Sequence, residues 1–244
     1  MKTRAAFIVV CMIVLYFLVS YLPIDSGFEQ QCIDYTQVEF VSVRQEVISE
    51  ASMNVPAVSE NRTGIVTNVL VQVMPGTGRI LTNIDKILFW ADTQDSIRKA
   101  TKAAERHLDM NISEYDLIYT ITADAAVIEG PSAGAALAIT TIAALENREV
   151  NQSVMITGTI DEQGNIGKVG GINEKVGAAI SNGVELFFIP KGNVPTISGF
   201  GKEKVCRSVG GFDVCEVRYL SRTHLNLSVK EVNNINQTLE YFLI

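Results

Sequence analysis

The sequence predicts one α/β domain, of the α+β kind, preceded by a single N-terminal transmembrane helix. Helix-like and strand-like hydrophobic patterns alternate along most of the chain, which is typical of a domain that packs helices on a sheet. The chain has 244 residues, of which 47% are hydrophobic and 19% charged, and this is enough for one sizeable folded core. A long uncharged segment stands at its N-terminus.

The N-terminal segment 1–22 has the length of a membrane span. Residues 5–22 are uncharged and would span roughly 27 Å as a helix, close to the hydrocarbon thickness of a bilayer. A cleavable signal peptide has a shorter apolar core and small residues at its exit, whereas residues 19–23 read VSYLP. We interpret 1–22 as a transmembrane anchor, with a signal peptide as the alternative, and either engages the secretion machinery.

The charges beside this segment predict its orientation. Lys2 and Arg4 precede the span, while the short polar tether at 23–37 contains acidic residues and no lysine or arginine. The positive-inside rule then leaves the N-terminus in the cytoplasm and places the domain at 38–244 outside it, in a single-pass membrane protein. N-x-S/T triplets in this domain are compatible with a glycosylating compartment. They begin at Asn61, Asn111, Asn151, Asn226 and Asn236.

Charge and cysteine content argue against several classes of function. The net charge of −7 gives no support to nucleic-acid binding, which depends on clustered lysine and arginine. The chain has no C-x-x-C motif and no cluster of histidine and cysteine, so we expect no metal site and no cofactor. Cys206 and Cys215 flank a Gly-Gly pair typical of a hairpin turn. A disulfide that closes this hairpin and a pair of free thiols are both open.

Each element of the domain is predicted from its local pattern. A helix at about 93–108 places Ile97, Ala100 and Ala104 on one face. The segment 161–165, DEQGN, is rich in turn residues and predicts the connection of a hairpin. The other predicted elements are strands at 65–74, 116–122, 154–160 and 184–189, helices at about 131–145 and 173–182, and a C-terminal helix that starts at the capping box of Ser228 and Glu231.

Ser132 stands at the start of an alanine-rich helix, in the hexapeptide EGPSAG. At such a helix start the free backbone N–H groups point outward, and the helix dipole favours negative charge. These donors suit an oxyanion that forms after attack by the Ser132 hydroxyl. The alternative is that Pro131 and Ser132 only begin a helix.

Lys175 stands in the first turn of the predicted helix at 173–182. The helix dipole and burial both disfavour an ammonium group there, which leaves a neutral amine able to take a proton from a serine hydroxyl. The two histidines, His107 and His224, do not lie beside a glycine-rich nucleophile turn, so a Ser-His-Asp triad has less support. The alternative for Lys175 is a solvated residue on the helix surface.

Together, these segments resemble the proteolytic domain of the Lon family, in its archaeal type. The matching motifs are EGPSAG at 129–134, Thr157-Gly158 with the hairpin after it, GGINEK at 170–175 and FFIPKGN at 187–193. Ser132 and Lys175 are 43 residues apart, and Ser132 and Thr157 are 25 apart, which are the spacings of the family. The resemblance covers about 62–200 well and the C-terminus loosely.

This resemblance implies a role for each matched residue. Ser132 is expected to be the nucleophile, Lys175 the general base and later proton donor, and Thr157 the residue that orients the lysine. Glu129 matches an acidic position of some archaeal-type enzymes. The hypothesis for Glu129 is that it orients a substrate or switches the site, and a solvated loop carboxylate is the alternative. The implied fold is compact, with a small twisted sheet flanked by helices. Because Lon proteolytic domains assemble as rings, a homo-oligomer is expected.

The sequence also departs from the family. It contains no GxxxxGK[ST] motif, and the glycine-rich segment 75–82 lacks the lysine that would reach a phosphate, so we expect no bound nucleotide. The resemblance therefore implies an ATP-independent serine endopeptidase with a Ser-Lys dyad. Its substrates would be polypeptides that are already unfolded or flexible. The alternative is a non-catalytic binding or adaptor module of the same fold at the membrane.

Overall fold

The computed structural model describes residues 46–83, 91–123, 130–193, 195–196, 200–209, 212–221 and 227–244. Within 200–209 and 212–221 it describes the backbone and the side chain of Cys206. Residues 44–244 form one compact unit. The predicted anchor at 1–22, the tether at 23–37 and Glu129 lie outside the described residues. Among the helices that are described, none is both long and apolar enough to cross a membrane.

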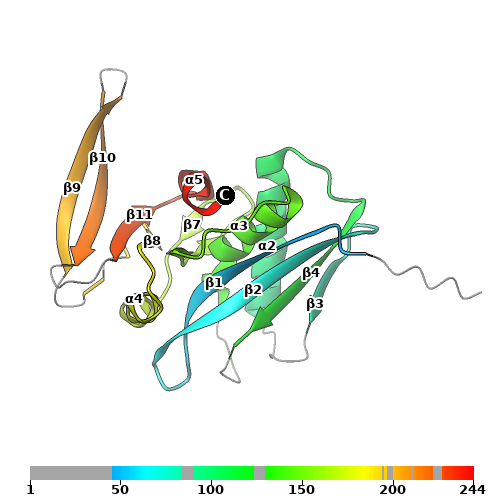
Figure 1. Cartoon of the computed structure of the whole chain (residues 1–244), viewed down its shortest axis with the longest axis horizontal. Coiled ribbons are helices and arrows are strands. Elements are labelled where there is room, and N and C mark those ends of the chain that lie inside the picture. Colours follow the sequence, from blue (N-terminus) through cyan, green and yellow to red (C-terminus); the bar gives the residue numbers. More distant parts are fainter. Residues whose placement is uncertain are drawn as a thin grey trace, which may run out of the picture. The chain divides into compact units, whose positions relative to one another are not determined.

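The first sheet has four strands in the order β1-β2-β4-β3 (Figure 1). The β1–β2 and β2–β4 pairs are antiparallel and β3 is parallel to β4. Along β2 the residues Val69, Val71 and Val73 are buried while those between them are half-buried, because side chains alternate across a strand. The strands are β1 (Ser49–Val58), β2 (Gly64–Pro75), β3 (Ile80–Asn83) and β4 (Tyr115–Thr122).

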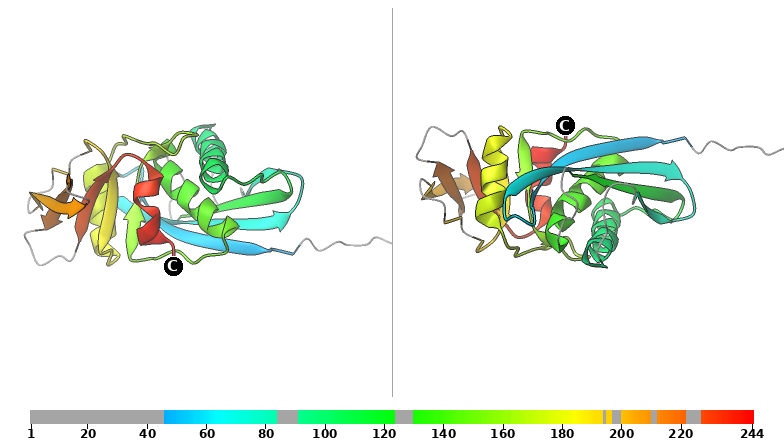
Figure 2. Two further views of the ribbon diagram at one scale, coloured as in Figure 1. Left: turned by 90° about the horizontal axis from the view of Figure 1, so that it is seen from above. Right: turned by 90° about the horizontal axis from the view of Figure 1, so that it is seen from below.

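Helix α3 (Gly134–Leu145) is buried along almost its whole length, with only Leu145 partly exposed. It packs against β1 and β2 and beside α2 (Ala91–Leu108), as Figures 1 and 2 show. A helix that meets protein on every side needs an apolar surface all round, and the sequence GAALAITTIAAL supplies one. Helix α2 buries one face only, including the predicted Ile97, Ala100 and Ala104. Both predicted helices are confirmed.

Tyr119 of β4 joins the sheet to both helices. Its side chain is fully buried, and its hydroxyl lies 2.8 Å from Thr101 Oγ1 of α2 and 2.8 Å from Thr141 Oγ1 of α3. The two threonine hydroxyls also donate to backbone carbonyls of their own helices. A buried phenol needs such partners, because an unpaired hydroxyl in the core costs free energy.

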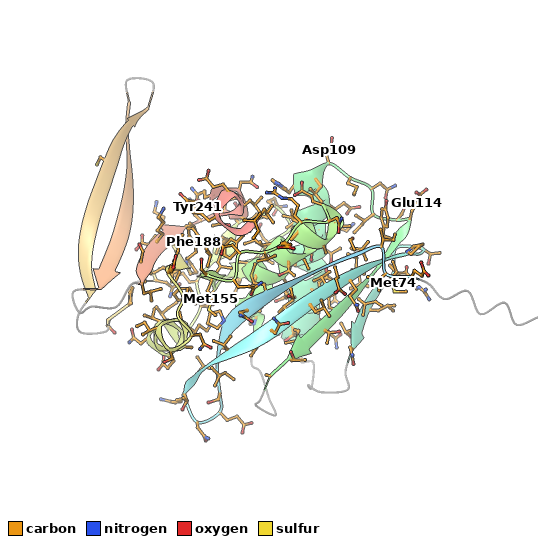
Figure 3. All side chains as sticks on the ribbon, viewed as in Figure 1. Met74, Asp109, Glu114, Met155, Phe188 and Tyr241 are labelled. Carbon is orange, nitrogen blue, oxygen red and sulfur yellow. The ribbon has the colours of Figure 1, made fainter. Side chains whose placement is uncertain are left out.

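The second sheet has the order β5-β8-β11-β10-β9, with β5, β8 and β11 parallel. Strand β8 is buried on both faces: Phe187 and Ile189 pack against helix α4 (Ile172–Ser181), and Phe188 faces the larger core. Phe188 meets Tyr241 edge-on, with ring centroids 5.3 Å apart (Figure 3). The strands are β5 (Val154–Ile156), β8 (Leu186–Pro190), β9 (Phe200–Val209), β10 (Phe212–Ser221) and β11 (Ser228–Val232).

A short hairpin of β6 (Thr159–Ile160) and β7 (Ile166–Gly167) lies near the start of α3. Its turn is held by Asp161, whose Oδ1 accepts from the backbone N–H groups of Gln163 at 2.9 Å and Asn165 at 2.8 Å. An aspartate that binds the backbone ahead of it is a common turn device. The predicted hairpin connection at 161–165 is confirmed.

The predicted C-terminal helix start at Ser228 and Glu231 is wrong. These residues lie in β11, which runs parallel to β8 and pairs Ser228 with Leu186. The capping box is a local signal, whereas the partner strand that decides the structure lies about forty residues earlier in the chain. The helices beyond it are the short 3-10 helix η3 (Ile235–Gln237) and α5 (Leu239–Phe242).

Candidate active site

Ser132 lies in a 3-10 turn, η2 (Pro131–Ala133), that leads directly into α3. The turn is pressed against β6: a Cβ atom on Gly134 would lie 2.8 Å from Ile160 N, so only glycine fits there. The Ser132 carbonyl accepts a hydrogen bond from Gly158 N at 2.9 Å. The predicted helix start is therefore confirmed, and it fixes the backbone of Ser132 on the frame of the domain.

Thr157 connects Ser132 to Lys175. Its Oγ1 donates to the Ser132 carbonyl at 3.2 Å and accepts from Lys175 Nζ, also at 3.2 Å. Thr157 is fully buried, and its own N–H donates to Phe188 O at 3.1 Å. The three residues that the sequence analysis singled out thus meet in space, although they come from η2, the end of β5 and α4.

Lys175 stands in the first turn of α4 with only 3% of its surface exposed. Burial lowers the pKa of Lys175 to about 8, because the ammonium form loses its hydration, while the neighbouring Glu174 carboxylate acts in the opposite direction. With this pKa, roughly a tenth of the amine is neutral at pH 7, a far larger share than an ordinary lysine has. A neutral amine can accept a proton, which an ordinary surface lysine cannot do at that pH.

The Ser132 hydroxyl and the Lys175 amine line the same pocket without a hydrogen bond between them. In the described part of the chain, Lys175 Nζ bonds to Thr157, and the half-buried Ser132 side chain makes no hydrogen bond. Hydrogen bonds between catalytic groups are often long in a free enzyme and shorten when substrate binds. The arrangement brings the pair together but leaves the serine hydroxyl to turn toward the amine.

One expected feature is only partly present. The sequence analysis assigned the free N–H groups at the start of α3 to an oxyanion. Ala135 N, in the first turn of α3, already donates to Gly158 O at 3.0 Å. This donor is therefore engaged in holding β6 against the helix and does not face a substrate.

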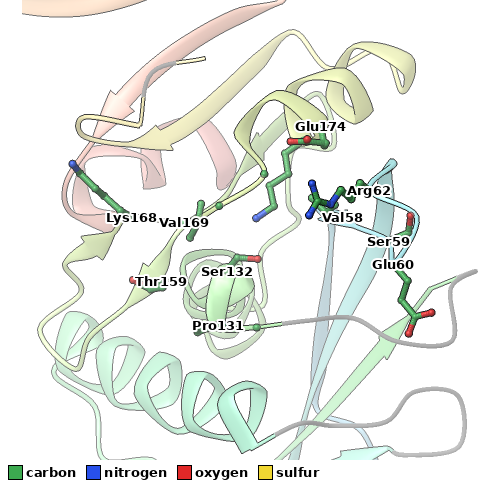
Figure 4. A pocket seen from close by; sticks show the side chains of 14 residues that line it. Val58, Ser59, Glu60, Arg62, Pro131, Ser132, Thr159, Lys168, Val169 and Glu174 are labelled. Carbon is green, nitrogen blue, oxygen red and sulfur yellow. The ribbon is translucent and has the colours of Figure 1, made fainter. Parts of the chain in front are cut away.

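The pocket around Ser132 has a volume of about 810 Å³ (Figure 4). Its walls come from the turn between β1 and β2, from η2, from the β6–β7 hairpin with the segment that follows it, and from the start of α4. This size accommodates several residues of an extended peptide. The lining residues are Val58, Ser59, Glu60, Arg62, Gly130, Pro131, Ser132, Thr159, Lys168, Val169, Gly170, Gly171, Glu174 and Lys175.

Sequence reasoning missed four charged residues of this pocket. They are Glu60 and Arg62 in the turn between β1 and β2, Lys168 after β7, and Glu174 beside Lys175. Glu174 lies inside the GGINEK motif, but no role was expected for it; no motif marks the other three, which are ordinary surface residue types in turns and at element ends. Only the fold brings them to the side of Ser132.

A second pocket, of about 530 Å³, shares Pro131 and Thr159 with the first. Its charged lining comes from Asp92, Asp95 and Lys99 of α2 and from Asp161 of the hairpin turn. Lys99 and Asp95 form an ion pair at 2.5 Å. The two pockets therefore adjoin at the wall that carries the serine.

The remaining predicted site residues stand as follows. Glu129 lies outside the described residues. Cys206 is disulfide-bonded, and the pairing of β9 with β10 sets Cys215 directly opposite it, as the predicted hairpin requires. Within the described ranges, no three histidine, cysteine, aspartate or glutamate side chains are grouped so that they could hold a metal ion.

Comparison with known proteins places most of this fold in one family. Residues 61–208 match the family described as the Lon protease (S16) C-terminal proteolytic domain. The matched range contains Ser132, Thr157, Lys175 and most of the pocket.

Individual relatives agree with this match. An archaeal Lon protease of Archaeoglobus fulgidus is 27% identical over 147 residues, which are 58% of this chain and 23% of the relative. The protein of the same name from Pyrococcus abyssi is 28% identical over 179 residues, 70% of this chain and 18% of the relative. That from Methanocaldococcus jannaschii is 31% identical over 140 residues, 54% of this chain and 21% of the relative. The chain thus spans about a fifth to a quarter of the length of these relatives.

Proposed function

Because the chain belongs to the family of Lon protease C-terminal proteolytic domains, we propose that it is a serine endopeptidase with Ser132 as nucleophile and Lys175 as general base. The observation that carries the proposal is the buried amine of Lys175, with a pKa of about 8, in one pocket with Ser132. A scaffold gains nothing from burying a lysine beside a serine, since burial of an ammonium group costs free energy.

The proposed reaction uses one proton carrier. The neutral amine of Lys175 takes the proton of the Ser132 hydroxyl while Oγ attacks the carbonyl carbon of the peptide bond. Lys175, now charged, gives this proton to the nitrogen of the leaving amine, and an acyl-enzyme remains on Ser132. Water then attacks the acyl group with Lys175 again accepting a proton. Lys175 returns this proton to Ser132 Oγ as the acyl C–O bond breaks, the acid product leaves, and both groups are back in their starting states. Thr157 holds the amine between these steps through its 3.2 Å hydrogen bond.

The reaction requires one adjustment of the site. The Ser132 hydroxyl must turn toward Lys175 Nζ, because it makes no hydrogen bond to the amine in the described arrangement. Rotation about χ1 redirects the hydroxyl at little energetic cost, since serine rotamers differ by small energies. Bound substrate would favour the productive rotamer by excluding water from the pocket.

The proposal extends to the setting of the enzyme. We propose a homo-oligomer anchored to the membrane by residues 1–22, with its N-terminus in the cytoplasm and its domain outside it. Hydropathy and flanking charges of the sequence support the anchor. The absence of a GxxxxGK[ST] motif in these 244 residues supports cleavage without a nucleotide. Substrates would then be polypeptide segments that are already unfolded.

Covalent labelling tests the proposal. The full chain is treated with a phosphonate probe that phosphonylates active-site serines, and its intact mass is measured. We expect one adduct, which peptide mapping places on Ser132, and we expect Ser132→Ala and Lys175→Ala to lose it. Ser113→Ala and Lys102→Ala, which change exposed residues away from the pocket, serve as matched controls and keep the adduct.

The same experiment distinguishes a non-catalytic module. The unmade hydrogen bond between Ser132 and Lys175 is the one observation that favours such a module. If a folded, oligomeric wild-type chain takes up no probe and leaves denatured casein uncut with and without ATP, the catalytic proposal is wrong. Binding of casein under those conditions would then identify an adaptor.

A further inference from the structure

The turn between β1 and β2 forms one rim of the pocket and holds Arg62 in an unusual backbone conformation. Arg62 has φ of 57°, in the left-handed region that residues other than glycine, asparagine and aspartate seldom adopt. Hydrogen bonds fix it there: Arg62 N donates to Ser59 O at 2.9 Å, and Ser59 N donates to Thr63 O at 2.9 Å. Strained residues that a structure holds in place cluster at binding sites.

The side chain of Arg62 is directed into the pocket rather than away from the turn. Figure 4 shows its nitrogen atoms on the side of the pocket centre, with Ser132 on the opposite wall. The same view shows Glu60, its neighbour in the turn, directed away from Ser132. The turn therefore presents the cation, and not the carboxylate, to a molecule bound over the serine.

Among the residues that the structure describes, the guanidinium of Arg62 has no carboxylate as its partner. Within the described residues, ion pairs join Arg79, Lys99, Lys102 and Arg148 to carboxylates, but none involves Arg62. Glu174 lines the same pocket and still forms no ion pair with it. Arginine carries donors in a planar fork that matches a carboxylate. An arginine aimed into a substrate pocket with these donors unused suits a carboxylate of the substrate.

The other charged groups that the structure describes do not attract a substrate carboxylate toward Ser132 in this pocket. The net charge of −7 repels an acidic polypeptide at long range, so any attraction must be local. The second pocket is acidic, with Asp92, Asp95 and Asp161 against Lys99. Arg62 and Lys168 are the cations of the first pocket other than the buried Lys175, and Figure 4 shows the end of Lys168 directed away from Ser132. Arg62 is the cation placed to select substrates near the reacting bond.

We propose that Arg62 is a specificity-determining residue that binds a carboxylate of the substrate close to the scissile bond. This inference rests on the proposed peptidase function. The carboxylate is either an aspartate or glutamate side chain or the free C-terminus of the polypeptide, and both present the same planar anion to the guanidinium. The enzyme would thus prefer acidic segments, or chain ends, among the unfolded polypeptides that reach it.

The test is a set of peptides cleaved by the full chain. Each peptide carries glutamate or the isosteric, uncharged glutamine at one of the three positions on either side of the scissile bond. A second set compares a free C-terminal acid with its amide at the same distances. We expect the carboxylate to raise kcat/KM by about tenfold at one position, mainly through KM, as a single charge-assisted contact does. Because Arg62 is exposed, this ratio should fall as salt concentration rises.

Variants assign the preference to Arg62. Arg62→Gln should reduce the glutamate-to-glutamine ratio to below about twofold, and Arg62→Lys should retain part of it, since lysine keeps the charge but loses the fork. Arg98→Gln makes the same change at an exposed arginine of α2 outside the pocket and should keep the wild-type ratio. If Arg62→Gln removes the preference for glutamate over glutamine, Arg62 binds an acidic side chain at that position. If it removes the preference for the free C-terminal acid over its amide, Arg62 binds the end of the chain.

Several outcomes would overturn the inference: no carboxylate preference in the wild type, an undiminished preference in Arg62→Gln, or a preference removed by Lys168→Gln instead. Probe labelling of Ser132 separates these results from failure of the peptidase proposal. If Arg62→Gln is still labelled at Ser132, a lost preference reports on specificity. If the wild type is neither labelled nor active, the peptidase function itself is wrong.

Discussion

Lys175 shows how one buried residue serves reactivity at the expense of stability. Its amine is almost fully buried, and its partner among the described residues is the neutral hydroxyl of Thr157. Within the described ranges no carboxylate forms a hydrogen bond or ion pair with it, and Glu174 acts on it through its charge alone. The fold therefore makes the charged form of this lysine unfavourable, which both prepares a base and costs folding free energy.

The first prediction concerns pH and rate. Since the base must be neutral, kcat/KM should rise about tenfold per pH unit below the pKa of Lys175 and level off above about 8. The Glu174 carboxylate raises that pKa, so Glu174→Gln should move the midpoint of the profile to lower pH. Initial rates on an uncharged peptide between pH 6 and pH 10 measure both. A profile without a midpoint near 8 would contradict the assignment of Lys175 as the base.

The second prediction concerns stability. The pKa of Lys175 falls from the ordinary 10.5 to about 8 on folding, which corresponds to a cost of about 3 kcal/mol at neutral pH. Lys175→Met removes this cost and loses one hydrogen bond, worth about 1 kcal/mol, so it should raise the free energy of unfolding by about 2 kcal/mol at pH 7. Urea denaturation measures this change.

The sign of its pH dependence follows from the same shift. Between about pH 8 and 10.5 the unfolded chain binds the proton that the folded chain has released, so wild-type stability rises with pH across this window. The difference in free energy of unfolding between Lys175→Met and the wild type should therefore become smaller as the pH rises through this window. A variant that is less stable than the wild type at pH 7 would show that the amine is better solvated than its burial implies.

At the scale of elements, α3 is the central helix against which the neighbouring helix and strands pack. It carries η2 and Ser132 at its start and packs against α2, β1 and β2. Tyr119 fixes the relative position of α2, α3 and β4 through two hydroxyl contacts. Anything that loosens this junction should reach Ser132 through the helix.

The third prediction tests this junction. Tyr119→Phe keeps the ring but removes the hydroxyl between Thr101 and Thr141, so it should lower the free energy of unfolding by about 1–2 kcal/mol. Below its unfolding transition, the variant should keep most of the wild-type kcat/KM although its free energy of unfolding is lower, since the ring still fills the core. Thermal unfolding followed by circular dichroism, beside kcat/KM below the transition, makes the comparison. Asn68→Ala, at a half-buried polar position on the opposite face of the sheet, is the control.

At the scale of the whole molecule, the matched range of 61–208 contains most of the pocket around Ser132 but no motif for a nucleotide. Energy for unfolding a substrate would have to come from another source. Under the proposed function, the substrates are therefore segments that are already extended, since a folded protein cannot place its backbone into a pocket of this size.

The fourth prediction follows for substrates. The chain should cut reduced, carboxymethylated lysozyme and leave native, disulfide-bonded lysozyme intact, with the same result in the presence of ATP and Mg²⁺. Gel electrophoresis over time, with Ser132→Ala as the blank, gives the answer. Rapid loss of the native protein would mean that this chain, or its assembly, unfolds substrates actively.

Much of the fold and part of the site could be predicted from the sequence, and the boundary follows the range of the interactions. Ser132 and Lys175 stand at the starts of predicted helices, and both helices are confirmed. The strand predicted at 154–160 is divided into β5 and β6, and Thr157 lies between the two. The fold brings the three residues together. The roles of these three residues stay predictions. Strand β11 was mistaken for a helix start because its pairing with β8 is invisible to a local pattern.

The charged rim of the pocket shows the same limit. Arg62 occupies an ordinary turn sequence, and nothing within a few residues of it distinguishes it from a solvated arginine. The role proposed for Arg62 depends on Ser132, which stands seventy residues later in the chain and lines the same pocket. Such relations depend on the fold, so a single sequence does not reveal them.

The pocket has two kinds of wall, and we expect their residues to change at different rates in evolution. Ser132 and Thr157 belong to the packed frame, where almost every substitution disturbs a neighbour. The turn from Ser59 to Thr63 is largely exposed, and Ser59, Glu60 and Arg62 of this turn line the same pocket. Descendants of this protein can exchange the residues of that turn without endangering the frame. New substrate specificities can therefore evolve in the turn, while the packed wall with Ser132 and Thr157 keeps the same arrangement.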